Sequence, residues 1–172
     1  MGLAKNTGKT TTLNYMIKLF QDEPIGLTSI GLDGEELDQI NFMPKPRIRV
    51  QKGMVVATAE ACLKDTKVSY DIIQKTELFT ALGNIYLIRI KEEGFLVIAG
   101  PTTNSDLKKL IEWMKPYTHK LFIDGAFNRM TFSNIHLIDG MCLSTGATVH
   151  PQMKDTILKT KAIVDAYMFD QT

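Results

Sequence analysis

A glycine-bounded segment near the start of the chain constrains the fold more than any other part of the sequence. Residues 2–11 read Gly-Leu-Ala-Lys-Asn-Thr-Gly-Lys-Thr-Thr, and apolar side chains recur at helical spacing along residues 9–20. The apolar face of this predicted helix consists of Leu13, Met16, Ile17 and Phe20. A loop of this kind presents consecutive backbone N–H groups to an anion, and the helix dipole favours negative charge there. The segment therefore predicts a phosphate-binding loop in an α/β fold.

The residues of this loop have distinct expected roles. Gly8 lets the backbone approach the phosphates, Lys9 reaches the β- and γ-phosphates as a candidate catalytic group, and the Thr10 hydroxyl binds Mg²⁺. The predicted nucleotide-binding residues are Lys5, Asn6, Thr7, Gly8, Lys9, Thr10 and Thr11. The expected ligand is Mg²⁺ with ATP or GTP, and the sequence does not decide between the two nucleotides.

The loop departs from the standard P-loop in two respects. The standard spacing requires the first glycine at position 3, where this chain has Leu3, and Gly2 comes one residue early. A P-loop also follows a buried strand, whereas only Met1 precedes Gly2, so the first strand of the sheet is predicted to be missing. Another element, a partner or a second copy of the chain would then occupy its place. The alternative is a helix N-terminus that merely reads Gly-Lys-Thr.

Short β-rich runs alternate with amphipathic runs along the rest of the chain, which is typical of βαβ architecture. The predicted strands are 24–30, 120–123 and 141–143, and the further predicted helices are 104–115 and 153–169. Two additional pairings are expected, one between 47–50 and 54–58 and one hairpin between 85–91 and 95–99. We expect one P-loop NTPase-like domain over residues 1–172, with a mostly parallel sheet flanked by helices.

Residues 120–125 form a second motif, Lys-Leu-Phe-Ile-Asp-Gly. An apolar strand that ends in an aspartate resembles the strand that supplies a carboxylate to the magnesium shell of P-loop enzymes. Asp124 is therefore a candidate metal ligand. The alternative is a strand-end turn in which Asp124 caps backbone amides. The order of loop and aspartate along the chain favours the metal role.

Three other positions each leave two interpretations open. Asp33 follows the strand after the loop helix, so it is a candidate catalytic residue that senses the γ-phosphate, or a residue of a solvated turn. Glu60 lies at a strand-to-helix junction, as a further acidic candidate or as a first-turn residue favoured by the helix dipole. Residues 144–147 (Ser-Thr-Gly-Ala) form either a base-contacting loop or a helix-capping turn.

The composition excludes several classes of function. Lys and Arg total 20 and Asp and Glu total 19, a balance that argues against a nucleic-acid-binding surface. Cys62 and Cys142 are far apart in the sequence, which is the spacing of neither a disulfide framework nor a zinc site. Two isolated cysteines fit a reducing cytoplasm. No apolar run approaches the ~20 residues that span a bilayer.

Several blocks of sequence together resemble one family. They are Gly2–Asn14, Gly26–Glu35, Pro44–Ile48, Val56–Glu60, Ala99–Pro101, Phe122–Ala126 and Ser144–Ala147. Across nearly all of its length the chain is similar to the KamB-type subunit of the lysine 5,6-aminomutase reactivase. The resemblance implies an accessory protein that acts with a larger ATPase subunit. It further implies that the two restore an adenosylcobalamin- and pyridoxal-phosphate-dependent aminomutase of lysine fermentation.

The leading hypothesis is a nucleoside-triphosphate-binding accessory protein, which would be an ATPase or GTPase if it hydrolyses the nucleotide. Phosphates would bind at residues 5–11, Mg²⁺ would bind Thr10 and Asp124, and a loop around Asp33 would switch. Two rivals remain: a small-molecule kinase or ligase of the same fold, and a non-enzymatic interaction subunit with a degenerate loop.

Overall fold

The computed structural model describes residues 1–4, 6–31, 48–64, 66–125 and 137–169. The chain divides into two compact units, and each is described by itself. The first consists of Met1–Thr12 together with Gly125–Thr172, and the second of Leu13–Asp124. Helix α1 (Lys9–Leu19) contributes its first residues to the first unit and the remainder to the second.

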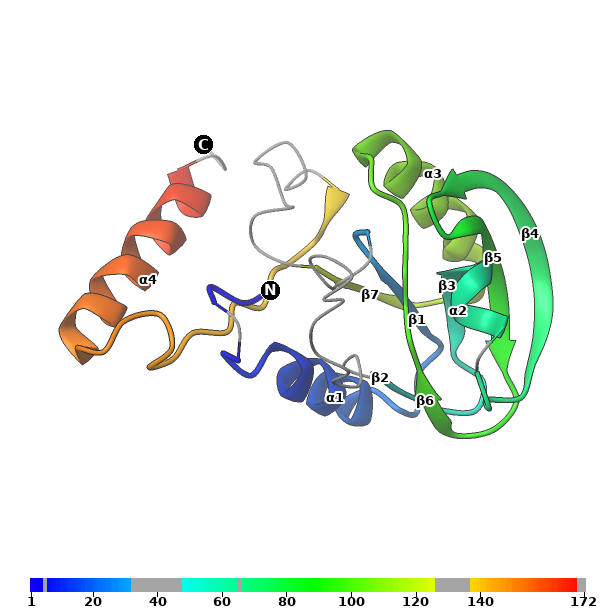
Figure 1. Ribbon diagram of the computed structural model, residues 1–172, viewed down its shortest axis with the longest axis horizontal. Helices are drawn as coiled ribbons and strands as arrows, with labels where there is room; N and C mark the ends of the chain where they lie inside the picture. Colours follow the sequence, from blue (N-terminus) through cyan, green and yellow to red (C-terminus); the bar gives the residue numbers. More distant parts are fainter. Residues whose placement is uncertain (5, 32–47, 65, 126–136, 170–172) are drawn as a thin grey trace. The chain divides into compact units, whose positions relative to one another are not determined.

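A five-stranded sheet forms the centre of the second unit, with the strand order β4-β5-β3-β1-β7 (Figure 1). The strands are β1 (Ile25–Ser29), β3 (Val55–Ala59), β4 (Tyr70–Thr80), β5 (Gly83–Ile90) and β7 (Lys120–Asp124). β1 is parallel to both β3 and β7, whereas β5 is antiparallel to both β3 and β4. The protein is thus α/β with a mixed sheet, and the prediction of a mostly parallel sheet is wrong.

The antiparallel half of the sheet comes from the long hairpin of β4 and β5, of which the sequence predicted only the second strand. In β4, polar residues interrupt the apolar ones, and the pairing with β5 shifts register between Ile72 and Gln74 and again between Lys75 and Phe79. These irregularities break the period-two pattern by which a strand is recognised.

Two predicted strand pairings are also wrong. β2 (Ile48–Val50) pairs with β6 (Gly94–Leu96) in a separate two-stranded sheet, so 47–50 does not pair with 54–58. β5 lies between β3 and β4 and has no edge left for 95–99. The sequence predicts pairing between strands that follow one another along the chain. In the structure, β2 pairs with β6, and β5 pairs with β3 and β4.

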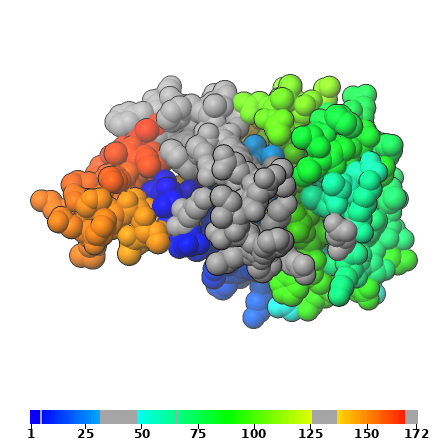
Figure 2. All heavy atoms as spheres, in the orientation of Figure 1, coloured from blue at the N-terminus to red at the C-terminus, as the bar shows by residue number. Residues whose placement is uncertain are grey.

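The sheet of the second unit is covered on both faces. Along β5, Ile85 and Leu87 join the cluster that includes Leu110 and Met114 of α3 (Asn104–Met114). Ile88 and Ile90 point to the other cluster, which includes Ile17 of α1. That second cluster also holds β2, β6 and Leu63 of the short helix α2 (Glu60–Lys64). Burying one such Leu or Ile side chain contributes about 1.5–3 kcal/mol. In the space-filling view, the cyan and green atoms of this unit form one continuous mass (Figure 2).

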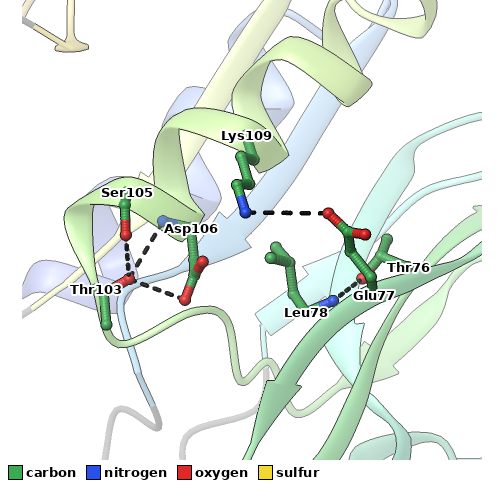
Figure 3. A network of polar contacts seen from close by, with 7 residues as sticks. All are labelled: Thr76, Glu77, Leu78, Thr103, Ser105, Asp106 and Lys109. Carbon is green, nitrogen blue, oxygen red and sulfur yellow. Dashed lines mark hydrogen bonds and ion pairs between the residues drawn. The ribbon is translucent and has the colours of Figure 1, made fainter.

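Helix α3 begins at the N-cap residue Thr103, whose hydroxyl contacts Asp106 in the first turn (Figure 3). The Thr103 hydroxyl accepts a hydrogen bond from the Asp106 N–H at 3.2 Å and donates one to the Asp106 carboxylate at 2.8 Å. Farther along the helix, Lys109 Nζ lies 3.9 Å from a Glu77 carboxylate oxygen of β4. The helix ends in a short 3₁₀ turn, η1 (Lys115–Tyr117). The predicted helix 104–115 and strand 120–123 are therefore confirmed to within one residue.

The first unit contains helix α4 (Met153–Phe169), which agrees with the prediction of 153–169. The Thr156 hydroxyl of α4 donates to the His150 carbonyl at 3.0 Å, and the Thr160 and Thr145 hydroxyl oxygens are 2.8 Å apart. The predicted strand 141–143 is reduced to an isolated parallel bridge between Gly2 and Ser144.

In the second unit, residues 97–101 cross the carboxyl ends of the parallel strands. The Gly100 N–H donates to the Ser29 hydroxyl at 2.9 Å, and the Gly31 N–H donates to the Pro101 carbonyl at 2.8 Å. A Cβ atom on Gly100 would lie 1.9 Å from the Ser29 carbonyl oxygen. Only glycine permits this approach, because the obstructing atom belongs to a buried strand backbone.

We expect Gly100→Ala to destabilise the protein by about 3 kcal/mol, because the strand or the crossing segment must shift to admit the methyl group. Urea unfolding followed by Trp113 fluorescence and circular dichroism measures the loss. Gly140→Ala is the control, because a Cβ there meets no atom of the described residues within 4 Å, and we expect it to change stability by less than about 0.5 kcal/mol. Equal stability of the two variants would contradict the argument.

Candidate phosphate-binding site

The segment that leads into the predicted phosphate loop is anchored by Ser144. The Ser144 N–H donates to the Met1 carbonyl at 2.7 Å, and the Leu3 N–H donates to the Ser144 carbonyl at 3.0 Å. These bonds form a short parallel ladder on both sides of the Gly2–Ser144 bridge. Residues 1–3, which lead into the loop, are thus held by a single parallel bridge to Ser144.

Gly2 has a packing role in this loop. A Cβ atom on Gly2 would lie 2.6 Å from the Thr7 hydroxyl oxygen. That hydroxyl donates to the Ala4 carbonyl at 3.0 Å and so closes the loop onto its own beginning. A glycine is needed at position 2 because the loop folds back against it.

The backbone of residues 6–9 alternates in handedness. Asn6 has φ of 62° and Gly8 has φ of 86°, while Thr7 has negative φ and Lys9 begins α1. Asn6 is the only non-glycine residue with positive φ among those that the structure describes. Asparagine tolerates this conformation better than most residues, although it is still uncommon there. Alternation of negative and positive φ occurs in nests, where successive backbone N–H groups face one side and bind an anion, so residues 6–9 are a candidate nest.

Helix α1 continues directly from the nest. The Thr12 N–H donates to the Gly8 carbonyl at 2.9 Å, which is the first hydrogen bond of helical type. The N–H groups ahead of it lie at a helix N-terminus, where they and the helix dipole favour an anion. Lys9 and Thr10 are half-buried and Thr11 is exposed. A Cβ on Gly8 would meet no atom of the described residues within 4 Å.

Ser144 also contacts the far side of the loop. Its hydroxyl oxygen lies 3.3 Å from that of Thr12, in the first turn of α1. The side chain is 9% exposed, although serine is usually at the surface. Ser144 thus holds both the entry to the loop, through Leu3, and its exit, through Thr12. The sequence marks Ser144 as the first residue of a predicted base-contacting loop or helix-capping turn. Its anchoring role has no local signal, because it depends on pairing with a segment more than a hundred residues away.

Asp124 ends β7 as the sequence predicted, and it belongs to the second unit. It is aligned with Ser29 in the parallel pairing of β7 with β1, and its carbonyl accepts from the Ile30 N–H at 2.8 Å. The residue is 7% exposed, so its carboxylate is held at the buried carboxyl edge of the sheet. Ligands of open α/β sheets bind at this edge.

Among the described acidic candidates, Glu60 does not form a metal-binding cluster with Asp124. Glu60 begins α2, and its carboxylate lies 3.5 Å from Lys64 Nζ one helical turn later. This geometry agrees with the interpretation of Glu60 as a first-turn residue. Within the described ranges, no group of three or more His, Cys, Asp and Glu residues could hold a metal ion. Lys5 and Asp33 lie outside the described residues.

No protein-family model, curated protein or solved structure matches the chain. The resemblance to the reactivase subunit therefore stays a prediction. In the part of the chain that the structure describes, no helix is both long enough and apolar enough to cross a membrane.

The contact between Gly2 and Thr7 can be tested by a double-mutant cycle. We expect Gly2→Ala to destabilise the parent protein by about 1 kcal/mol more than it destabilises a Thr7→Ala variant, because the second change removes the colliding oxygen. Thermal and urea unfolding of the four proteins give the coupling energy. Additive effects would mean that the loop does not close against Gly2.

Proposed function

We propose that the protein binds the phosphates of a nucleoside triphosphate in the nest formed by residues 6–9. The single observation that carries the proposal is the alternation of φ from Asn6 to Lys9 directly ahead of α1. A left-handed non-glycine residue costs about 1–2 kcal/mol in general, and such strain often marks a functional site. A helix N-terminus alone requires no such strain.

The chemistry of the loop suits a triphosphate. The backbone N–H groups of the nest and of the first turn of α1 would donate to phosphate oxygens. Lys9 would add a positive charge near the β- and γ-phosphates, and the Thr10 hydroxyl would bind Mg²⁺. The proposal thus needs few protein ligands for the metal, because magnesium keeps several waters and is shared with substrate phosphates.

Asp124 is the proposed carboxylate of the magnesium shell. Its burial at the carboxyl end of β7 supports this role, because a water-excluded carboxylate attracts a cation more strongly than an exposed one does. Asp33 is the proposed sensor of the γ-phosphate. Hydrolysis of the nucleotide would require Asp124 and Asp33 as well as the nest.

The proposed biological role is that of a cytoplasmic accessory protein. The resemblance stated above supports nucleotide-dependent reactivation of an adenosylcobalamin-dependent aminomutase together with a larger ATPase subunit. Melting curves with Mg-ATP and Mg-GTP, combined with turnover assays, separate this proposal from its rivals. A melting shift without turnover indicates a nucleotide sensor, and turnover without an acceptor indicates an NTPase. Turnover that requires a small-molecule acceptor indicates a kinase or ligase, and the lack of any shift indicates a scaffold.

We expect Lys9→Ala to abolish binding of Mg-ATP and Mg-GTP while the circular dichroism spectrum stays that of the parent. The lysine would contribute its charge to the phosphates and little to the core. Isothermal titration calorimetry measures the binding. Lys18→Ala is the matched control, because Lys18 is exposed in the last turn of the same helix. Parent-like binding by the Lys9 variant would rule out the phosphate loop.

We expect Asp124→Asn to weaken nucleotide binding in the presence of Mg²⁺ far more than in its absence. The substitution keeps the shape of the side chain and removes the charge that would act through the metal shell. One titration contains Mg²⁺, and the other contains EDTA and no Mg²⁺. Equal losses under both conditions would assign Asp124 a structural capping role instead.

A further inference from the structure

The short ladder at Ser144 brings a second loop next to the phosphate-binding nest. Gly2 and Ser144 form a parallel bridge, and Met1 and Leu3 bond to Ser144 on its two sides, so the residues that follow Leu3 and Ser144 leave from the same end of the bridge. After Leu3 comes the phosphate loop, and after Ser144 comes the segment 145–149. Because Ser144 also contacts Thr12, the second loop begins between the entry and the exit of the first.

The loop 145–149 is held at both ends and exposed between them. The Thr145 and Thr160 hydroxyl oxygens are 2.8 Å apart, which ties the start of the loop to α4. The Val149 N–H donates to the Gly146 carbonyl at 2.9 Å and closes a turn. Between these anchors, Ala147 and Thr148 are exposed. The loop therefore offers backbone groups, one methyl group and one hydroxyl in a fixed arrangement.

The two loops differ in charge. A nucleotide differs in the same way, because its phosphates are charged and its nucleoside is not. The phosphate loop carries Lys9, whereas residues 141–149 (Met-Cys-Leu-Ser-Thr-Gly-Ala-Thr-Val) carry no charged side chain. A base and a ribose are uncharged and are recognised by backbone groups, hydroxyls and apolar contacts. A loop without charge beside an anion-binding nest thus suits the part of the ligand that follows the phosphates.

We infer that the loop 145–149 contacts the nucleoside of the triphosphate whose phosphates bind at residues 6–11. This inference rests on the proposed function and extends it, because it assigns selectivity for the nucleoside to a segment distant in sequence from the phosphate loop. Ser144 acts as the positioning residue that fixes the spacing between the two subsites.

Titration calorimetry in the presence of Mg²⁺ tests the inference with three probes: ATP, GTP and inorganic tripolyphosphate. The variant Gly146→Val adds bulk to the second loop, and the described part of the fold can accept it, because a Cβ on Gly146 meets none of its atoms within 4 Å. Gly140→Val is the matched control, since a Cβ on Gly140 likewise has no neighbour within 4 Å among the residues that the structure places.

The parent should bind ATP or GTP more tightly than tripolyphosphate. Gly146→Val should weaken the preferred nucleotide about tenfold or more and leave tripolyphosphate binding unchanged, whereas Gly140→Val should change neither. Thr148→Val provides a second variant of nearly the same shape, with the same expected direction if the Gly146 variant does not fold.

Each other outcome overturns a defined part of the argument. Equal affinity of the parent for nucleotides and tripolyphosphate would exclude a nucleoside contact. Parent-like nucleotide binding by both loop variants, or an equal loss of tripolyphosphate binding, would exclude this loop as the contact. If the parent binds none of the three probes, the proposed phosphate site itself is wrong and the inference falls with it.

Discussion

The hydrogen bonds of Ser144 are the constraint on which the first unit depends. This one residue joins Met1 and Leu3 through its backbone and Thr12 through its hydroxyl, so it fixes both ends of the intervening loop. A loop closed at both ends loses much of its conformational freedom before any ligand arrives. The strained conformation of Asn6 can then persist, because the surrounding contacts determine the backbone around it. Preorganisation of this kind lowers the entropic cost of binding an anion.

The second unit reaches rigidity in a different way. Its sheet is buried on both faces, and every residue of β1 and of β3 is buried. The carboxyl edge of the parallel strands is closed by residues 97–101, which bind Ser29, Gly31 and Thr58 through hydrogen bonds. Buried hydroxyls satisfy the backbone groups that the end of each strand would otherwise leave without partners. Asp124 lies at this same edge, on a strand fixed along its whole length by pairing with β1.

Local patterns predicted the elements whose burial follows a simple period. Five elements lie within a few residues of their predicted bounds: α1, α3, α4, β1 and β7. Their apolar residues recur at helical spacing or form continuous runs, and both patterns follow from which side chains are buried. Strand partners could not be predicted, since the choice of β2 for β6 depends on which edges the central sheet leaves open. In the candidate site, the glycine and lysine of the loop were recognisable by type. The left-handed conformation of Asn6 and the anchoring by Ser144 were not, because both depend on contacts across the fold.

The register shifts of β4 have a consequence for the behaviour of the protein in concentrated solution. β4 is an edge strand, and a long regular edge with exposed side chains such as Ile72 and Phe79 would be a template for pairing with other chains. The two irregularities interrupt the row of outward-facing backbone groups, and Lys75 and Glu77 place charges between the exposed Ile72 and Phe79. An incoming strand would find no continuous register and would have to bury charge. The same distortions that conceal β4 from sequence-based prediction therefore protect the folded chain against aggregation.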